Sequence, residues 1–381
     1  MNDQAHPAPH ELADWLRLTS VSGVGPATQR QLLAAFGLPA NIFAADFIAI
    51  ATVIGDRLAS KLLTHDSRET VEQALQWASQ PGNRILTLAD PDYPPLLLEN
   101  GDPPSVLYVK GRVELLARPA IAIVGSRHAT PQGERDAEAF AAELAVTGLT
   151  IVSGQALGID AAAHRGALKV GGNTVAVIGT GADRIYPARN KELARQIAEK
   201  GAVVSEFPLG TEPLAANFPR RNRLIAGLSR GCLVVEAALD SGSLITARLA
   251  AEQGREVFAI PGSIHSPQAK GCHRLLKQGA KLVESAADIL EELAWIGAPC
   301  GTAGDKETAL PVQNTLALDN EGPNDPDAIT ILTALGHSPC DSDTLAQRTG
   351  LTTDRLCAML ATLELEGRLA VLPGGRYQRL S

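Results

Sequence analysis

The segment 217–226, NFPRRNRLIA, concentrates positive charge beside an aromatic side chain. Pro219 is typical of the first turn of a helix, so the polar residues after it would occupy the first turns. These polar residues are Arg220, Arg221, Asn222 and Arg223. Cations at a helix N-terminus are disfavoured by the helix dipole, and three arginines there indicate that a bound anion offsets the cost. With Phe218 placed to stack on a base, the segment predicts a binding site for single-stranded nucleic acid that is independent of base sequence, because it makes no contact with base edges.

An alternative interpretation assigns these arginines to the interior of the protein. Their guanidinium groups could pair with acids such as Glu206 or Glu236 and brace the fold without touching a ligand. We expect one or two of the arginines to be structural in this way and the others to bind phosphate.

Loops rich in glycine and serine follow several predicted strands, where ligands bind in open parallel sheets. They are the segments 125–127 (GSR), 153–154 (SG), 179–181 (GTG) and 241–246 (SGSLIT). Gly125 would let the backbone approach a ligand, Ser126 would donate to a phosphate oxygen, and Arg127 would add charge. Ser153 and Gly154 precede another helix start and would complete the same pocket.

Nucleotide-binding and zinc-protease motifs are incomplete or missing in the sequence. Gly179 and Gly181 begin a dinucleotide fingerprint, but Arg184 stands where its third glycine belongs. The sequence also has no P-loop and no H-E-x-x-H. The five cysteines are scattered without a C-x-x-C pair, which indicates neither zinc nor a disulfide framework. We therefore expect no catalytic residue, no metal and no cofactor.

Short apolar runs alternate with longer helical patterns from residue 120 onward. The runs predict strands at 120–124, 149–152, 174–178, 202–206, 232–236, 256–260 and 280–284. The intervening patterns predict helices at about 132–147, 159–169, 190–200, 220–229, 243–253, 271–278 and 286–293. This alternation predicts the α/β class, a Rossmann-like, doubly wound, mostly parallel sheet, in a domain spanning 81–296.

A helical domain is expected before the sheet, at residues 1–80. Within it, the segment 18–28 (LTSVSGVGPAT) resembles the turn of a helix-hairpin-helix, or SAM-like, element, whose backbone N–H groups can meet a DNA phosphate. The alternative is that this turn only connects two helices.

After the sheet we expect a linker at 297–323 and a winged helix at 324–381, because three helical patterns precede a hairpin there. The third of these helices, at 353–366, has one arginine, Arg355, against three acids. That composition favours a protein contact or weak duplex binding over the reading of an operator sequence.

The net charge of −8 is unevenly distributed along the chain. Residues 305–343 contain eight acids and one lysine, whereas residues 118–231 contain fourteen Lys or Arg and ten Asp or Glu. A locally basic domain beside an acidic linker is compatible with binding a polyanion. No run of eighteen apolar residues appears and the N-terminus lacks a signal-peptide pattern, so we expect a cytoplasmic protein with no membrane contact.

Seven motifs in the α/β region resemble, in order and with matching spacing, the DNA-processing protein A family, also called DprA or Smf. They are IVGSR, VSGQALGIDAAAH, VIGTGADRIYPARN, SEFPLGTEP, NFPRRNRLIAGLS, VVEAALDSGSLITARLAAEQGREVFAIPG and GCHRLLKQGA. The resemblance implies a homodimer that binds incoming single-stranded DNA in natural transformation, protects it from nucleases and loads the RecA recombinase onto it. It implies no enzymatic activity.

The family's DNA pocket carries over to particular positions of this sequence. They are Gly125, Ser126, Arg127, Ser153, Gly154, Phe218, Arg221, Asn222 and Arg223. One position departs from the pattern: some relatives have a lysine shortly before the phenylalanine, whereas Ala215, Ala216 and Asn217 precede Phe218 here.

Two other function classes fit parts of the sequence. A phosphoribohydrolase-like nucleotide-processing enzyme would carry P-G-G-x-G-T-x-x-E, and the comparable segment 240–246, DSGSLIT, lacks the double glycine and the final glutamate. A transcription regulator would act through sequence-specific duplex binding by the winged helix.

Overall fold

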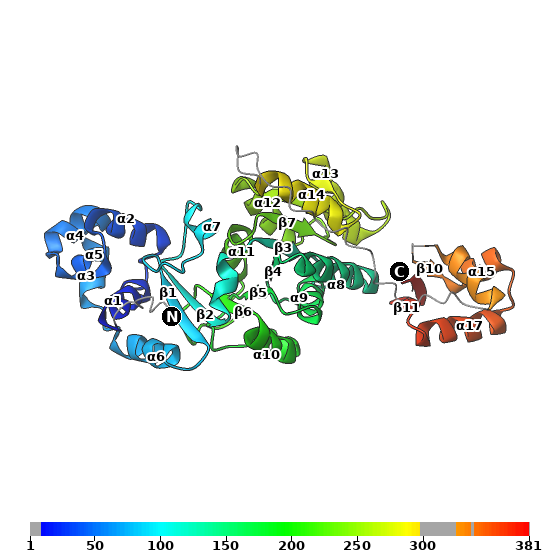
Figure 1. Cartoon of the computed structure of the whole chain (residues 1–381), viewed down its shortest axis with the longest axis horizontal. Coiled ribbons are helices and arrows are strands. Elements are labelled where there is room, and N and C mark those ends of the chain that lie inside the picture. Colours follow the sequence, from blue (N-terminus) through cyan, green and yellow to red (C-terminus); the bar gives the residue numbers. More distant parts are fainter. Residues whose placement is uncertain (1–8, 298–324, 337–338, 381) are drawn as a thin grey trace, which may run out of the picture. The chain divides into compact units, whose positions relative to one another are not determined.

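The computed structural model describes residues 9–297, 325–336 and 339–380, and the chain forms two compact units (Figure 1). One unit comprises Met1–Ala129 and Gly133–Leu293, and the other comprises Thr130–Gln132 and Ala294–Ser381. Apart from Gly297, the predicted linker lies outside the described residues. The predicted boundaries at 80 and 296 remain predictions.

The first unit begins with helices packed around their own apolar core. They are α1 (Pro9–Ser20), α2 (Pro26–Phe36), α3 (Pro39–Ala44), α4 (Phe47–Ile54), α5 (Asp56–Thr64) and α6 (Arg68–Ala78). Leu18, Val24 and Leu32 are buried where α1 meets α2. The turn between these helices needs a positive φ of 94° at Gly23, which glycine adopts without strain. The sequence at 18–28 therefore forms the predicted turn between two helices.

A nine-stranded sheet follows, with the strand order β1-β2-β6-β5-β4-β3-β7-β8-β9. The strands are β1 (Asn83–Thr87), β2 (Val106–Gly111), β3 (Ala120–Val124), β4 (Thr150–Ser153), β5 (Thr174–Val177), β6 (Ala202–Ser205), β7 (Gly231–Val234), β8 (Glu256–Ala259) and β9 (Lys281–Leu282). Pairing is parallel from β6 through β5, β4, β3, β7 and β8 to β9. At the other edge β1 pairs antiparallel with β2, and β2 pairs antiparallel with β6.

Helices cover both faces of this sheet. They are α7 (Pro95–Leu98), α8 (Pro131–Val146), α9 (Ile159–Lys169), α10 (Lys191–Lys200), α11 (Asn217–Gly227), α12 (Ser243–Glu252), α13 (Lys270–Lys277) and α14 (Ala286–Gly297), with short 3-10 turns η1 (Val113–Ala117), η2 (Ala188–Asn190) and η3 (Pro267–Ala269). Alternate residues of a strand point to opposite faces. Ala122 and Val124 accordingly pack with residues of α11, α12 and α13, whereas Ile121 and Ile123 pack with residues of α8, α9 and α14.

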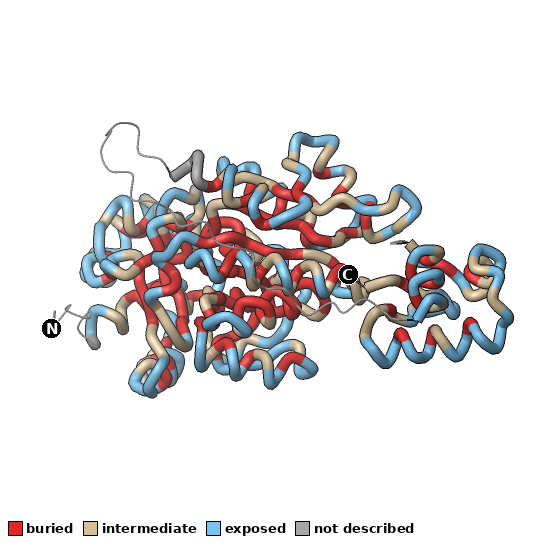
Figure 2. The backbone as a smooth tube through the Cα atoms, turned by 45° about the vertical axis from the view of Figure 1, so that its right-hand side comes forward, coloured by how far each residue is buried: buried red, intermediate tan, exposed pale blue. Residues whose placement is uncertain are grey.

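The strands form the most deeply buried part of the unit (Figure 2). The two-sided burial explains why the strands read as continuous apolar runs instead of alternating patterns. The predicted fold, a Rossmann-like doubly wound sheet, is confirmed. None of the described helices is long and apolar enough to cross a membrane.

An apolar cluster joins the helical part to the sheet. It contains Trp15 of α1 and Trp77 of α6 together with Ile85 of β1 and Tyr108 of β2. The rings of Trp77 and Tyr108 meet edge to face, with centroids 5.8 Å apart. The β1–β2 hairpin therefore belongs to the sheet on one side and to the core of the helical part on the other.

The second unit has the predicted order of a winged helix. Its elements are α15 (Pro326–Leu335), β10 (Cys340–Asp341), α16 (Ser342–Thr349), α17 (Thr353–Leu365), β11 (Leu369–Leu372) and β12 (Arg376–Arg379). The three strands form a sheet in the order β10-β12-β11. Arg355 on α17 forms an ion pair with Asp327. The positive charge that a helix reading a DNA duplex would present to phosphate is therefore paired within the protein.

Candidate nucleic-acid interface

A hollow of about 610 Å³ opens where β3 and β7 end and where α11 and α12 begin. We call it the sheet hollow. Six of the ten predicted site residues line it: Gly125, Ser126, Arg127, Phe218, Arg221 and Asn222. The other four, Ser153, Gly154, Arg220 and Arg223, do not line it. The hollow thus lies at the edge of the sheet where open parallel sheets bind ligands.

The loop after β3 is tightly packed. A side chain at Gly125 would come within 2.6 Å of Ile159, so glycine lets the loop lie against α9. The Ser126 N–H donates to the Glu236 carbonyl at 2.7 Å, and the Ser126 hydroxyl accepts from the His128 N–H at 3.1 Å. The hydrogen-bonding groups of Ser126 that were expected to bind a phosphate are therefore used within the protein. Arg127 and His128 are the exposed residues at this point of the loop.

The rim of the sheet hollow carries two aromatic rings and a cation. The Phe218 and Tyr186 ring centroids lie 5.7 Å apart, and the Arg127 guanidinium lies 5.5 Å from the Phe218 centroid. Tyr186 is 45% exposed although it is one of only four tyrosines in the chain. An exposed tyrosine ring and a partly buried phenylalanine ring beside a guanidinium offer stacking faces to a base and charge to a phosphate.

Helical periodicity sends the side chains of α11 in different directions. Residues four apart share a face, so Phe218 and Asn222 both face the sheet hollow. The helix begins at Asn217, two residues before Pro219, and the Asn217 side chain ties this start to the sheet by donating to the Gly179 carbonyl at 3.2 Å. The Asn222 side chain donates to the Gly242 carbonyl at 3.4 Å, across the hollow's floor.

Arg221 is buried beneath the sheet hollow and is only 3% exposed. Its Nη1 donates to the Val177 carbonyl at 2.6 Å. Burial lowers the pKa of Arg221 to about 10, while the nearby Asp160 carboxylate opposes this shift. Burial likewise raises the pKa of Asp160, and the Arg221 charge opposes that rise. A side chain at Gly154 would collide with the Arg221 guanidinium, so this glycine makes room for a buried charge.

Ser153 is fully buried, and its hydroxyl donates to the Ile123 carbonyl at 2.6 Å. The loop at 153–154 therefore supports the sheet hollow from behind and contributes no residue to its lining.

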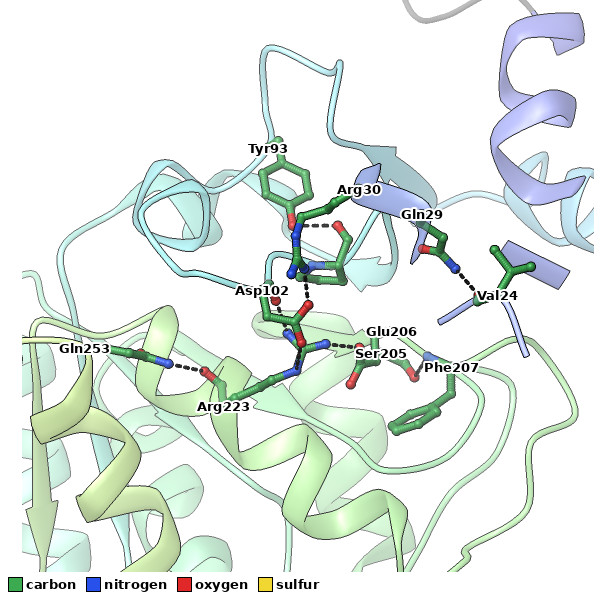
Figure 3. Close-up of polar contacts among 11 residues, drawn as sticks. Val24, Gln29, Arg30, Tyr93, Asp102, Ser205, Glu206, Phe207, Arg223 and Gln253 are labelled. Atoms are coloured by element: carbon green, nitrogen blue, oxygen red, sulfur yellow. Dashed lines mark hydrogen bonds and ion pairs between the residues drawn. The ribbon is translucent and has the colours of Figure 1, made fainter. Parts of the chain in front are cut away.

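Arg223 is engaged by acids inside the protein, as the alternative interpretation allows. It forms an ion pair with Glu206, whose side chain is 4% exposed, and its Nη1 donates to the Asp102 carbonyl at 2.6 Å. The Asp102 carboxylate in turn pairs with Arg30 of α2, so a chain of charges runs from α11 to the helical part (Figure 3). Burial raises the pKa of Glu206, and the Arg223 charge opposes that rise.

The start of α8 faces an acid of the same chain. A side chain at Gly133, in the first turn of this helix, would collide with the Glu236 carboxylate. A carboxylate at a helix N-terminus takes the place that a phosphate would otherwise favour. The Glu236 carboxylate therefore makes the start of α8 unfavourable for a second anion.

Several lining residues were not among the predicted site residues. Tyr186 is one of them, and the segment 241–246, which was predicted as a ligand-binding loop without particular site residues, contributes others. Ser241 and Ser243 hydroxyls lie 2.7 Å apart at the start of α12, and Thr246 lines the same wall. An exposed tyrosine in a chain poor in aromatics was the available signal for Tyr186. Within the described ranges, no three His, Cys, Asp or Glu side chains gather as metal ligands.

Acidification should destabilise the first unit through His164. The ring is fully buried on α9, its Nδ1 lies 2.7 Å from the Thr174 hydroxyl, and its Nε2 has no hydrogen-bond partner among the described residues. Burial, with the charges of Arg221 and Arg165, lowers the pKa of His164 from 6.5 to about 3. The unfolded state therefore takes up the proton first. Stability is intact above pH 6.5 and is lost toward pH 3 by up to about 1.4 kcal/mol per pH unit.

Urea unfolding at pH 7 and pH 5 measures this effect. His164→Gln should lose less stability between the two pH values than the wild type, because the buried titrating group is gone. The exposed His265, replaced by glutamine, is the matched control and should behave like the wild type. Equal pH dependence in all three proteins would contradict the assignment.

Comparisons with known proteins agree with this architecture. The family model described as DNA recombination-mediator protein A matches residues 84–294, and the DprA winged helix domain matches residues 317–375. Protein Smf of Escherichia coli (strain K12) is 41% identical over 367 residues, which cover 96% of this chain and 95% of that protein. The DNA processing protein DprA of Streptococcus pneumoniae is 50% identical over 206 residues, 54% of this chain and 73% of that protein.

Solved structures give the same result. The X-ray structure of DprA from Streptococcus pneumoniae covers 76% of this chain and 99% of its own, with a TM-score of 0.66 and 39% identity. A structure of DNA processing protein A from Helicobacter pylori, described for its single-stranded DNA binding mode, covers 56% of this chain and 96% of its own, with a TM-score of 0.51 and 33% identity. With its α/β sheet, its winged helix and these relatives, the chain belongs to the DNA recombination-mediator protein A family, the DprA/Smf proteins.

Proposed function

We propose that this chain binds single-stranded DNA independently of base sequence, with the sheet hollow as its principal site. The observation that carries the proposal is the exposed rim of Arg127, Phe218 and Tyr186, which combines stacking faces with a cation. Stacking and phosphate contacts tolerate every base because every base has a π-face. The single-stranded DNA binding described for the Helicobacter pylori relative supports the same assignment.

The predicted residues divide into two roles in this proposal. Gly125, Ser126, Arg127, Phe218, Arg221 and Asn222 form the pocket, with Phe218 as the stacking face and Arg127 as the exposed charge. Ser153, Gly154 and Arg223 support the pocket through their buried contacts. Arg220 is exposed on another side of α11.

The wider role follows from the family. We propose a cytoplasmic homodimer that protects incoming single-stranded DNA during natural transformation and loads RecA onto it, without catalysis of its own. The description of the family as recombination mediators supports this setting.

Salt dependence of oligonucleotide binding tests the proposal. For a labelled 20-nucleotide single strand, the logarithm of the association constant should fall with the logarithm of the salt concentration with a slope of about −1.4 to −2. This slope corresponds to roughly two or three phosphate contacts, since each contributes about −0.7 on single strands. A duplex of the same sequence should bind more weakly, because its bases are not free to stack on Phe218. A slope near zero, or release of free base from a nucleoside monophosphate, would favour the nucleotide-processing alternative instead.

A further inference from the structure

The segment 184–189, RIYPAR, carries the Tyr186 ring of the sheet hollow's rim on an exposed stretch of chain. We call this segment the rim platform. Ile185 is 43% exposed and Tyr186 is 45% exposed, so two consecutive large apolar side chains meet solvent. The arginines at its two ends, Arg184 and Arg189, are exposed as well. Aromatic and apolar side chains between cations suit single-stranded nucleic acid, because bases stack on the rings and the cations attract phosphates.

The two cations of the rim platform differ in their partners. Arg184 Nη1 lies 3.9 Å from the Glu212 carboxylate. Arg189 forms no ion pair with an acid in the part of the chain that the structure describes, although Arg195 on the following helix pairs with Glu192. The charge of Arg189 is therefore available to a phosphate beyond Tyr186.

Contacts at both ends fix the rim platform in place. The buried Asn190 side chain, directly after the platform, donates to the Gln155 carbonyl at 3.0 Å and to the Ala156 carbonyl at 3.1 Å. Ala156 lines the sheet hollow, so this end is tied to the hollow's wall. Just before the platform, the Asp183 carboxylate accepts from the Gly210 N–H at 2.9 Å. A surface held in this way needs little ordering when a ligand binds, which lowers the entropy cost of binding.

The Tyr186 ring joins the rim platform to the stacking face of the sheet hollow. The Tyr186 and Phe218 planes are tilted by 40° with their centroids 5.7 Å apart, within the range of a directly packed aromatic pair. A base cannot lie between rings that pack on each other, so each ring has only its remaining surface to offer. The two rings therefore suit two different bases.

We propose that the rim platform binds the nucleotide next to the one held in the sheet hollow. Its base lies on Tyr186 and Ile185, and its phosphate lies against Arg189. This subsite rests on the proposed function and extends it from a one-base pocket to a path of two nucleotides that leaves the hollow over residues 184–189. The platform accepts every base, because stacking and phosphate contacts read no base edges.

Arg189→Ala tests the phosphate contact by salt titration of labelled dT20. The slope should be smaller in magnitude by about 0.7, the value of one contact on a single strand, and binding at 0.1 M salt should be about fivefold weaker. Arg189→Lys keeps the charge and should retain the wild-type slope. Arg195→Ala is the matched control, because it removes an exposed arginine that Glu192 already pairs with, and it should also retain the slope. Equal slopes for the wild type and Arg189→Ala overturn the subsite.

Ile185→Asp tests the path of the strand with a negative charge. The side chain is 43% exposed, so the variant is expected to fold, which thermal melts verify. A phosphate passing at about 4 Å is repelled by about 1 kcal/mol in water, so dT20 should bind about fivefold more weakly. Ile48→Asp makes the same change on α4, where the side chain is 76% exposed, and should bind as the wild type does.

The outcomes separate this subsite from the proposed function. If folded Ile185→Asp and Arg189→Ala bind dT20 as the wild type does while Phe218→Ala loses affinity, the rim platform is overturned and the proposed function stands. Failure of the wild type to bind dT20 overturns both.

Discussion

Replacing Arg223 by alanine should destabilise the first unit by about 3–5 kcal/mol, the typical cost of removing one partner of a buried ion pair. Arg223 is 15% exposed and Glu206 is 4% exposed, so little solvent is available to take over the lost interaction. The Asp102 carbonyl would lose its donor as well. This cost falls on folding, because Arg223 does not line the sheet hollow.

Chemical unfolding in urea measures the loss, and Arg220 supplies the control. Arg220→Ala removes an arginine from the same helix, but its side chain is exposed and forms no ion pair within the described part of the chain. It only attracts Glu206 from a distance and lies over the Phe207 ring, so stability should change by less than about 1 kcal/mol. Similar stability losses in both variants would show that the Arg223–Glu206 pair has no special structural role.

Replacing Phe218 by alanine should weaken single-strand binding by roughly 5- to 150-fold, because a base stacked on an aromatic ring contributes about 1–3 kcal/mol. The variant also removes the ring that Arg127 and Tyr186 lie against, so the rim loses its arrangement together with its stacking face. The effect on folding should be smaller, because Phe218 is only partly buried.

Fluorescence titration of a labelled 20-nucleotide strand measures this affinity. Phe218→Tyr keeps an aromatic face and should bind within a few-fold of the wild type. Phe47→Ala removes an exposed ring from α4, 42% exposed and distant in the sequence, and should leave binding unchanged. If Phe218→Ala binds as the wild type does, the stacking site lies elsewhere.

The fold could be predicted closely because its strands are buried on both faces. A run such as 120–124 is apolar throughout, so its limits are sharp in the sequence and match β3. The start of α11 was predicted too late. Pro219 is a local signal, whereas the bond from Asn217 to the Gly179 carbonyl joins residues 38 apart in the sequence and has no local signature.

The residue types of the candidate site were predicted from the sequence, but which of these residues line the hollow and which support it from within was not. Three arginines within four positions look alike in a sequence, and only the helix orientation separates exposed Arg220 from buried Arg221. The commitment of Arg223 depends on Glu206 at the end of β6, which the strand order brings beside α11. Such long-range pairings depend on the order of the strands in the sheet. The sequence alone therefore indicated that an arginine could either bind phosphate or pair with an internal acid, but not which arginine does which.

The apolar cluster around Trp15, Trp77, Ile85 and Tyr108 has a mechanical consequence. Small polar contacts between parts of a protein permit relative motion, whereas a dry apolar core resists it. We therefore expect the helical part and the sheet to move together as one rigid body. A single strand that binds at the rim of the sheet hollow therefore meets a preformed surface, and the conformational adjustment on binding falls mainly on the nucleic acid.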